Sequence, residues 1–442
     1  MISTAKTAFA YFMFFIFFSQ LFSAQQPIVK LTPAEKKLVI DSICKRLKDI
    51  YIFPEKAKKM ADGISYKYDR GDYNIIDDPS QFAGKLAADL VNISQDRHIN
   101  ITFDPIWVQT SRKAISKKDS LELLSRDFPN ALADNFGFKT VDILAGNIGY
   151  LNLTRFYAPA LGGDTATSVM NFLSNTESII IDLRQNDGGR GDMVQLIASY
   201  FFESEPIMIA DIYSREDDHH RQDWTLPYLP GKRMPDKPLY LLVGQATFSA
   251  AESLSYFLKN RNRAILVGQV TGGGAHPVHH KILTDRFTLF IPYARFIDPI
   301  TNTDWEGTGV IPDIVVSEKE ALTTAHIAAL EGVVKDQAKS RSKTWALEVV
   351  KARIKPIAIS PVILKSYTGS YAGGIRKLTY EEGKLYIQRN GEPRYELVPL
   401  SGKTFHIEEL PYLHIKINTE NGKAVSLIRQ YNDGSDIQDP KD

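Results

Sequence analysis

The chain has 442 residues, of which 43% are hydrophobic and 24% are charged. This length predicts two or three domains, and this balance excludes wholesale disorder. The formal net charge is +1, and no long basic run is present, so nothing in the charge pattern indicates nucleic-acid binding. The one cysteine, Cys44, cannot form an intramolecular disulfide or a cysteine metal site.

Residues 1–24 have the pattern of a secretory signal peptide. Lys6 is the one charge, residues 8–18 are almost wholly apolar, and small and polar residues follow up to Ala24, where we expect cleavage. The alternative is an uncleaved membrane anchor, although the apolar stretch is short for a full span. No later segment could cross a membrane. The expected location is therefore outside the cytoplasm, either periplasmic or extracellular.

Residues 27–135 predict a mainly helical N-terminal domain. Val39, Ile43 and Leu47 recur at helical spacing, and Pro33 stands where a helix would begin. We find no residues that indicate chemistry before residue 94.

Residues 136–335 predict an α/β catalytic domain with a mostly parallel sheet. Apolar runs typical of buried strands alternate with amphipathic stretches typical of helices, an order that implies right-handed crossovers. Residues 286–296 predict one further strand, at an exposed or antiparallel edge. The other expected strands cover residues 147–153, 177–184, 238–244 and 263–270, and the helices cover residues 192–202 and 250–260.

The remaining chain predicts a helix and linker at residues 336–359 and a small all-β domain at residues 360–442. The helical pattern extends over residues 327–354 before the linker prolines. Asn-Gly pairs at Asn390 and Asn421 separate alternating runs and indicate hairpin turns. We expect an antiparallel barrel or sandwich with a structural or substrate-screening role. A lipocalin-like ligand site is the alternative.

The segment around Ser249 carries the first indication of chemistry. It follows a buried strand and opens a helix, so Ser249 would lie at the ligand-binding edge of the sheet and at a helix N-terminus. The same residues also form a capping box with Glu252. Both roles place the hydroxyl at the helix start and can therefore coexist.

A glycine-rich loop closes the predicted strand at residues 177–184. Gly188 and Gly189 would let the backbone approach a ligand and direct N–H groups at it. No Gly-Lys-Ser/Thr follows, so the loop does not match a phosphate-binding Walker pattern. A tight turn without function is the alternative.

Together, ESIIIDLRQNDGG, FSAAE, AILVGQVTGGG and GTGVIPD resemble the catalytic domain of the tail-specific (C-terminal processing) proteases, over roughly residues 140–320. The resemblance implies that Ser249 is the nucleophile. It also implies that the backbone N–H groups of Gly189 and Ala250 form the oxyanion hole.

One departure assigns the chain to a lysine-less branch of that superfamily. Members with a Ser–Lys dyad carry the lysine in a Gly-Lys-Gly turn, whereas this chain has Gly272, Gly273 and Gly274 there. No PDZ-type insert is recognisable. Over about residues 35–320 the chain resembles the repeat of interphotoreceptor retinoid-binding protein, and it is also similar to the core protease of the tricorn type.

The resemblance to the tricorn type implies a histidine base from the N-terminal side and a glutamate near the end of the catalytic domain. His98 and Glu306 match these positions. A serine needs such a base at neutral pH, and the ordinary pKa of histidine, about 6.5, suits the task. His98 would activate Ser249, and Glu306 would orient the base or bind substrate. The alternatives are a structural histidine and an ordinary turn glutamate.

Five further histidines suggest zinc, but neighbours on a strand point to opposite faces, which weakens the hypothesis. They are His219, His220, His276, His279 and His280. A polar loop near the cleft is the simpler interpretation, and we expect no metal and no cofactor.

The sequence thus predicts an exported serine peptidase with a crotonase/ClpP-like catalytic domain, acting on a peptide or protein through an acyl-enzyme on Ser249. We expect no nucleic-acid partner and no stable membrane span after signal cleavage, and the sequence leaves the oligomeric state open. The alternative is a non-proteolytic binding protein for an apolar small molecule, like the retinoid-binding relatives.

Overall fold

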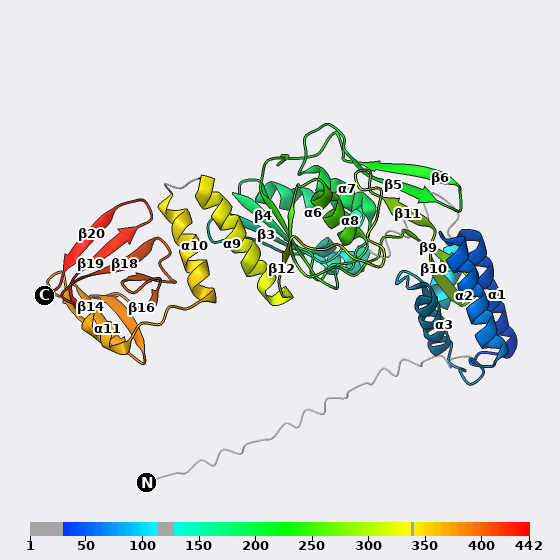
Figure 1. The fold of residues 1–442 in the computed structure, drawn as a ribbon, viewed down its shortest axis with the longest axis horizontal. Coiled ribbons are helices and arrows are strands. Elements are labelled where there is room, and N and C mark those ends of the chain that lie inside the picture. The colour runs from blue at the N-terminus through cyan, green and yellow to red at the C-terminus, as the bar shows by residue number, and fades with distance from the viewer. Residues whose placement is uncertain (1–29, 114–127, 337–339) are drawn as a thin grey trace, which may run out of the picture.

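The computed structural model describes residues 30–113, 128–336 and 340–442. The predicted signal peptide, residues 1–24, lies outside the described residues. The molecule is elongated, with helices at its N-terminal end, an α/β region in the middle and a β-barrel at the far end (Figure 1). In the described part of the chain, no helix combines the length and the apolar character needed to cross a bilayer.

The N-terminal region packs three helices that each begin with a proline, and the Thr32 and Asp78 side chains cap the first and third of them. Their apolar faces form one core, to which strand β10 contributes Phe287, Leu289 and Ile291. A segment from the catalytic region therefore completes the N-terminal core. The elements are α1 (Pro33–Ile50), α2 (Pro54–Asp69), α3 (Pro79–Ser94), β1 (Asn100–Phe103) and α4 (Pro105–Lys113).

The central sheet has the strand order β12-β8-β7-β4-β3-β2 and is parallel except for the edge strand β2. Strands β4 and β7 are buried at every position, as their continuous apolar runs predict. The predicted mostly parallel sheet is confirmed. The strands are β2 (Phe138–Leu144), β3 (Ile148–Leu153), β4 (Ser178–Asp182), β7 (Leu239–Val243), β8 (Ile265–Gly268) and β12 (Ile314–Val315).

Helices cover both faces of this sheet. Side chains of α6 (Pro159–Leu173), α7 (Gly191–Ser199) and α8 (Ala250–Asn260) share a core with alternate residues of β4 and β7. Side chains of α9 (Glu318–Asp336) form a second core, on the other face of the sheet, with the remaining residues of β4 and β7. The arrangement places the turns after β4 and β7 at one edge of the sheet.

The strand predicted over residues 286–296 is divided between two small sheets. β10 (Phe287–Pro292) pairs with β1 and with β9 (Val278–Ile282), while β11 (Ala294–Ile297) pairs with β5. A hairpin of β5 (Met208–Ser214) and β6 (His219–Trp224) was not predicted from the sequence. A short 3-10 turn, η1 (Asn135–Gly137), precedes β2.

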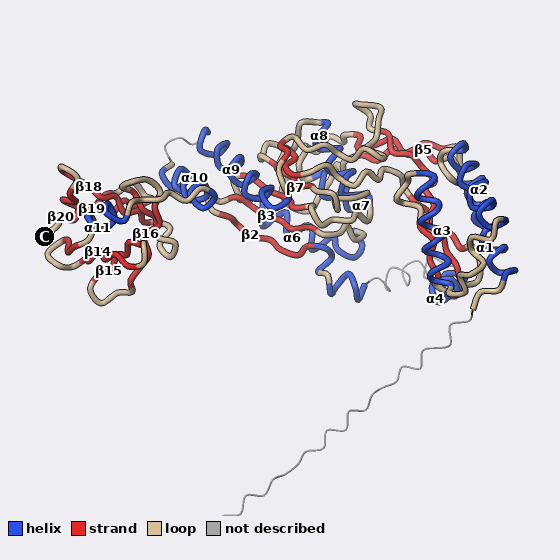
Figure 2. Tube along the Cα trace, turned by 60° about the horizontal axis from the view of Figure 1, so that its bottom comes forward, coloured by secondary structure: helices blue, strands red, loops and turns tan. Residues whose placement is uncertain are grey.

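The helical pattern at residues 327–354 belongs to two helices, α9 and α10 (Arg341–Ile354), and Figure 2 shows α10 between the central sheet and the barrel. The barrel strands follow one another in sequence order. Hydrogen bonds from Ala372 N–H to Pro440 and from Asp442 N–H to Ser370 close the barrel. Its elements are α11 (Pro361–Ser366), β13 (Gly369–Tyr371), β14 (Arg376–Glu381), β15 (Lys384–Arg389), β16 (Arg394–Pro399), β17 (Thr404–His406), β18 (Leu413–Glu420), β19 (Lys423–Tyr431) and β20 (Asp436–Pro440).

Candidate active site

Ser249 lies in the turn between β7 and α8, at the carboxyl edge of the parallel sheet. Its backbone has φ +51° and ψ −116°, a strained conformation that costs a non-glycine residue on the order of 1–3 kcal/mol and clusters at functional sites. The predicted capping box is present, and Glu252 accepts the backbone N–H of Ser249 at 2.9 Å. The half-buried serine thus stands at a helix N-terminus, where developing negative charge is stabilised.

The fully buried Glu252 carboxylate joins the serine turn to the glycine turn that follows β8. Besides the Ser249 N–H, it accepts the Thr271 hydroxyl at 2.5 Å and the N–H groups of Gly273 and Gly274 at 2.6 and 2.8 Å. Burial raises the pKa of Glu252, and these donors oppose the rise. Four donors on one carboxylate hold the two turns in a fixed relation.

The glycine loop after β4 packs directly on the serine turn. A Cβ added to Gly188 would lie 2.8 Å from the Cβ of Ser249, and one added to Gly189 would lie 2.2 Å from the carbonyl oxygen of Phe156. Both glycines also have positive φ, 106° and 129°, so side chains are excluded on two grounds. Within the described residues, the N–H groups of Gly189 and Ala250 donate to no acceptor. Two free amide donors beside a serine are what an oxyanion hole requires.

A cavity of about 440 Å³ opens beside Ser249, and a second of about 160 Å³ shares several of its walls. Gly189, Ser249 and His276 line both cavities. Polar and charged side chains from the start of α7 and from β6 line the larger one, including Arg190, Asp192, Gln195, Arg221 and Asp223. Such walls suit a polar, extended ligand better than an apolar molecule.

His276 follows the glycine turn and is only 2% exposed. Its Nδ1 lies 3.0 Å from Oδ2 of Asp96 and 3.4 Å from Oε2 of Glu306. The Tyr51 hydroxyl also donates to Oδ2 of Asp96, at 3.0 Å. Among the described residues, Nε2 of His276 has no partner. One ring nitrogen is therefore held by carboxylates, and the other is buried without a partner among the described residues.

The two carboxylates beside His276 differ in their affinity for a proton. Burial raises the pKa of Glu306 to about 7, an increase that His276 opposes and the charge of Asp96 reinforces. For Asp96, burial acts in the same direction, but the side chain of His276 and the N–H of His98 outweigh it and lower the pKa. Asp96 is therefore the ionised partner of His276, while Glu306 titrates near neutral pH.

His98, the predicted base, packs against Phe248, the residue before Ser249. Its ring is 4.7 Å from the ring of Phe248, centroid to centroid, and a Cβ added to Gly274 would lie 2.5 Å from its Cε1. Nδ1 and Nε2 are buried and lack partners among the described residues, and Nδ1 is 3.8 Å from a carboxylate oxygen of Asp96. Burial lowers the pKa of His98 to about 4. His98 is not among the residues that line the two cavities beside Ser249.

Ser249, Gly189 and Ala250 therefore line one cavity. Glu306 is not a lining residue, but its carboxyl group lies beside His276, which is. Sequence reasoning did not single out Asp96, and it interpreted His276 as part of a polar loop. Two signals were present. Asp96 stands two residues before the predicted base, and His276 directly follows the turn that carries the base in lysine-dyad relatives.

The other histidines of the zinc hypothesis are dispersed. The ring of His279 stacks on Tyr293, the ring of His280 is hydrogen-bonded to the Thr288 hydroxyl, and His220 pairs with Asp211. Among the described residues, the one group that could hold a metal ion is Asp96, His276 and Glu306, whose ligand atoms lie within 4.8 Å of one another.

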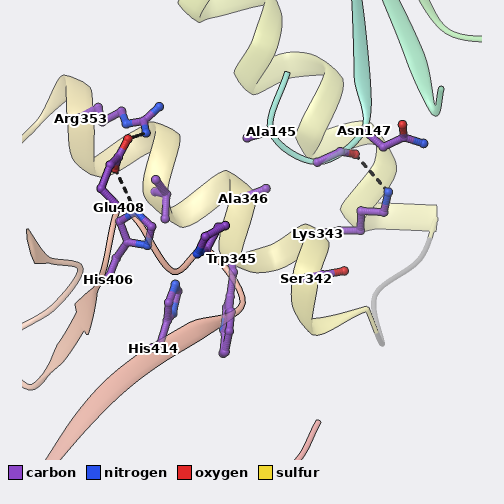
Figure 3. A pocket seen from close by; sticks show the side chains of 13 residues that line it. Ala145, Asn147, Ser342, Lys343, Trp345, Ala346, Arg353, His406, Glu408 and His414 are labelled. Carbon is purple, nitrogen blue, oxygen red and sulfur yellow. Dashed lines mark hydrogen bonds and ion pairs between the residues drawn. The ribbon is translucent and has the colours of Figure 1, made fainter. Parts of the chain in front are cut away.

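A separate cavity of about 340 Å³ lies between α10 and the barrel (Figure 3). His414 stacks on Trp345 with 3.8 Å between ring centroids. The charged groups here are already paired within the chain, Arg353 with Glu408 and Lys343 with the main chain of Gly146. No serine with an adjacent histidine base is present among its lining residues, so we do not regard this cavity as the active site.

Two family models match the chain. Residues 147–316 match the model described as peptidase family S41. Residues 19–132 match the model described as the N-terminal domain of peptidase S41 in eukaryotic IRBP. The first match contains the glycine loop and the serine turn, and the second contains Asp96 and His98.

Curated relatives are carboxyl-terminal-processing proteases. The carboxy-terminal-processing protease of Bartonella bacilliformis is 23% identical over 337 residues, which cover 68% of this chain and 74% of that protein. The chloroplastic carboxyl-terminal-processing peptidase 3 of Arabidopsis thaliana is 28% identical over 178 residues, covering 40% of this chain and 33% of that protein. The chain thus matches only a third of the length of this second relative.

Solved structures that match the chain include the photosystem II D1 C-terminal processing protease, with a TM-score of 0.41 and 14% identity over 65% of this chain and 94% of that chain. A crystal structure of a peptidase from Parabacteroides merdae has a TM-score of 0.43 and 18% identity over 64% of this chain and 90% of that chain.

Proposed function

The chain belongs to peptidase family S41, and from that premise we propose that it hydrolyses peptide bonds through an acyl-enzyme on Ser249. The observation that carries the proposal is the strained Ser249 at the start of α8, with two unused N–H groups beside it. A serine that served only as a helix cap would need neither feature.

The reaction follows from the geometry. Oγ of Ser249 attacks the carbonyl carbon of the scissile bond while a base accepts its proton, and the carbonyl oxygen becomes an oxyanion. The N–H groups of Gly189 and Ala250 donate to that oxyanion. The C–N bond then breaks, and the protonated base donates its proton to the leaving amine. Water repeats the sequence on the ester, which releases a carboxylic acid and restores Ser249.

The base in this proposal is a histidine, because its ordinary pKa lies close to neutral pH. His98 is the base that the resemblance implies, and His276, which lines the cavity beside Ser249, is a second candidate. Glu306 would orient the base, as its position 3.4 Å from His276 Nδ1 supports.

Three finer features are part of the same proposal. The catalytic region is crotonase/ClpP-like, supported by its mostly parallel sheet with helices on both faces. The domain boundaries are those expected from the sequence, with a catalytic domain at residues 136–335. The protein is exported by the signal peptide at residues 1–24 and meets its peptide or protein substrate in the periplasm or outside the cell.

The alternative of a binding protein for an apolar molecule stays a prediction. The charged walls of the larger cavity beside Ser249 do not favour it, whereas apolar side chains, among them Ile212, Phe296 and Trp305, line part of the smaller one. A binding protein would also have no use for a strained serine.

The proposal is tested by replacing Ser249 with alanine and measuring cleavage of a fluorogenic peptide library. We expect Ser249→Ala to abolish turnover. The matched control is Ser255→Ala in the same helix, whose hydroxyl donates to the carbonyl of Ala251, and we expect it to keep its activity. Full turnover by folded Ser249→Ala would refute the proposed function.

A further inference from the structure

The C-terminal barrel contains a cavity of about 250 Å³ at the end where β14 begins and β19 ends, and we propose that it binds a carboxylate carried by a small apolar or aromatic group. The barrel forms the end of the molecule opposite the N-terminal helices (Figure 1). This cavity shares no lining residue with the two cavities beside Ser249 or with the one between α10 and the barrel. It is therefore a site separate from the proposed peptidase reaction.

Three arginines line this end of the barrel. Each of them stands two residues from a core side chain on the same strand, and side chains alternate between the two faces of a strand. The arginines therefore share the face of the strand that points into the barrel. The pairs are Arg376 and Leu378 in β14, Arg389 and Ile387 in β15, and Arg429 and Leu427 in β19.

Two of these arginines are direct neighbours across strands. In the register of β14 and β15, Arg376 is opposite Arg389. Like charges directly opposite each other destabilise a sheet. The side chain of Arg376 is only 13% exposed, so water screens its charge less than it would at the surface. Such a pair is offset only by negative charge close by.

The carboxylates of the barrel do not balance the three positive charges. The buried Asp439 accepts Nε and Nη2 of Arg429 at 2.9 and 3.3 Å, and Nη1 of Arg376 lies 3.1 Å from the same carboxylate. Glu392 pairs with Arg389 at 2.7 Å. Three arginines with two carboxylates leave one positive charge in excess, which a ligand with a single negative charge would neutralise.

Arg376 is the least satisfied member of this cluster. Its contact with Asp439 is the one polar contact that its side chain makes within the described residues. Burial lowers the pKa of Arg376, and the charge of Arg429 adds to this effect while Asp439 opposes it. For Arg429, burial acts in the same direction, but the hydrogen bonds to Asp439 outweigh it and raise the pKa. Arg376 thus keeps unused N–H donors, and a carboxylate fits them because a guanidinium can bind both of its oxygens.

The rest of the lining favours an apolar group next to that carboxylate. Buried isoleucines and the rings of tyrosines line the cavity beside the arginines. Inorganic phosphate would contact the arginines but leave this apolar surface without a partner. The volume is below that of pockets for drug-sized ligands, about 300–1,000 Å³, so the apolar group is small. The isoleucines are Ile387, Ile407 and Ile415, and the tyrosines are Tyr395, Tyr412 and Tyr431.

Two sources offer this chemistry. One is the last residue of a peptide, which carries the terminal carboxylate beside its side chain, and the other is a free aromatic or aliphatic acid of similar size. The proposed peptidase reaction releases peptides with new terminal carboxylates. Binding in the barrel does not depend on that reaction, so the two proposals fail separately.

The test is isothermal titration calorimetry on the full chain carrying Ser249→Ala, which keeps a peptide probe intact. The probes are an acetylated tetrapeptide that ends in phenylalanine, the same peptide as its C-terminal amide, and phenylpropanoate. We expect an acid to bind, and the amide to bind at least about 10-fold more weakly than the acid peptide if that peptide is the ligand, because hydrogen bonds between charged groups are the stronger ones. Binding by the acid peptide alone identifies peptide ends as the ligand, and binding by phenylpropanoate alone identifies free acids.

Variants assign the binding to the barrel. Arg376→Gln should weaken binding of the acid by about 10-fold to 100-fold, while the Arg429 pair with Asp439 stays in place. The matched control is Arg394→Gln, because this exposed arginine precedes Tyr395 on β16 and so faces outward. It should bind the acid like the parent chain.

A second variant predicts the opposite change. Glu392→Gln removes the partner of Arg389 and should tighten binding of the acid by about 2-fold to 5-fold. Glu392 is exposed, so this measurement decides the matter if Arg376→Gln does not fold. Equal affinity of the acid for the parent chain and both variants would overturn the proposal, as would the absence of binding by either acid at millimolar concentration. An active Ser249→Ala would reject the peptidase proposal alone.

Discussion

The Glu252 carboxylate offers the sharpest test of how the two turns of the site are held together. In Glu252→Gln, the shape of the side chain is kept, but an NH₂ group replaces one oxygen. That oxygen accepts two donors, whichever one is replaced: the Thr271 hydroxyl and Gly273 N–H, or the N–H groups of Ser249 and Gly274. Each buried donor left without a partner costs about 1–3 kcal/mol. The free energy of unfolding should therefore fall by about 2–6 kcal/mol.

A drop of this size lowers the Tm of a region this large by roughly 2–4 °C per kcal/mol. The assay is thermal unfolding of the full chain, with peptidase activity measured below the transition. Activity should fall at least 100-fold in the folded variant, because Ser249 and the glycine turn lose their common anchor.

The matched control is Glu320→Gln, since Glu320 makes the same kind of capping contact with Ser317 at the start of α9 but is exposed. It should lower the Tm far less than Glu252→Gln does, because its donors stay exposed to water, and it should leave activity intact. Equal Tm and activity in Glu252→Gln and Glu320→Gln would refute the reasoning.

Three other predictions follow from the same site. The pKa of Glu306 is about 7 in the folded state against an ordinary 4.5. Its contribution to the free energy of unfolding is therefore fully present below pH 4.5 and is lost as pH rises through 7. The loss amounts to about 3 kcal/mol. The Tm difference between wild type and Glu306→Gln across pH 4.5–8 measures it, and a constant difference would contradict it. Gly274→Ala should reduce activity by more than 10-fold, because its Cβ would lie 2.2 Å from Phe248 Cζ and 2.5 Å from His98 Cε1; normal kcat/KM would show that the turn can move. Treatment with EDTA should leave peptide cleavage unchanged, since the proposed reaction needs no metal, and a loss restored by Zn²⁺ would contradict that expectation.

Local patterns were sufficient to predict much of the fold. The apolar run at residues 177–184 indicates a strand buried on both faces, and the structure has β4 there. Helix α8 covers the predicted residues 250–260. These elements are predictable because the pattern of apolar residues within each segment is enough to indicate a helix or a buried strand.

Elements whose environment depends on distant segments were harder to predict. Residues 286–296 have one apolar pattern, yet β10 packs against the N-terminal helices while β11 joins the β5–β6 hairpin. β6 is mostly exposed, so its sequence carries no alternation of apolar and polar residues. A pattern along one segment cannot show which of two sheets a strand will join.

The same limit applies to the site. Ser249 and the glycine loop could be inferred because each follows a recognisable strand. His98 was favoured as base on resemblance, and nothing in the sequence shows that Asp96, two residues away, lies beside His276. That contact exists because β1, which follows His98, pairs with β10, and β10 in turn pairs with β9, the strand that follows His276.

The most direct measurement of the central claim is to locate the covalent adduct. The full chain is treated with a fluorophosphonate, digested, and analysed by mass spectrometry of the peptides. We predict one phosphonylated serine, Ser249, on the peptide that spans the start of α8, and no adduct in Ser249→Ala. An adduct on another serine, or labelling of Ser249→Ala at the wild-type rate, would contradict the account.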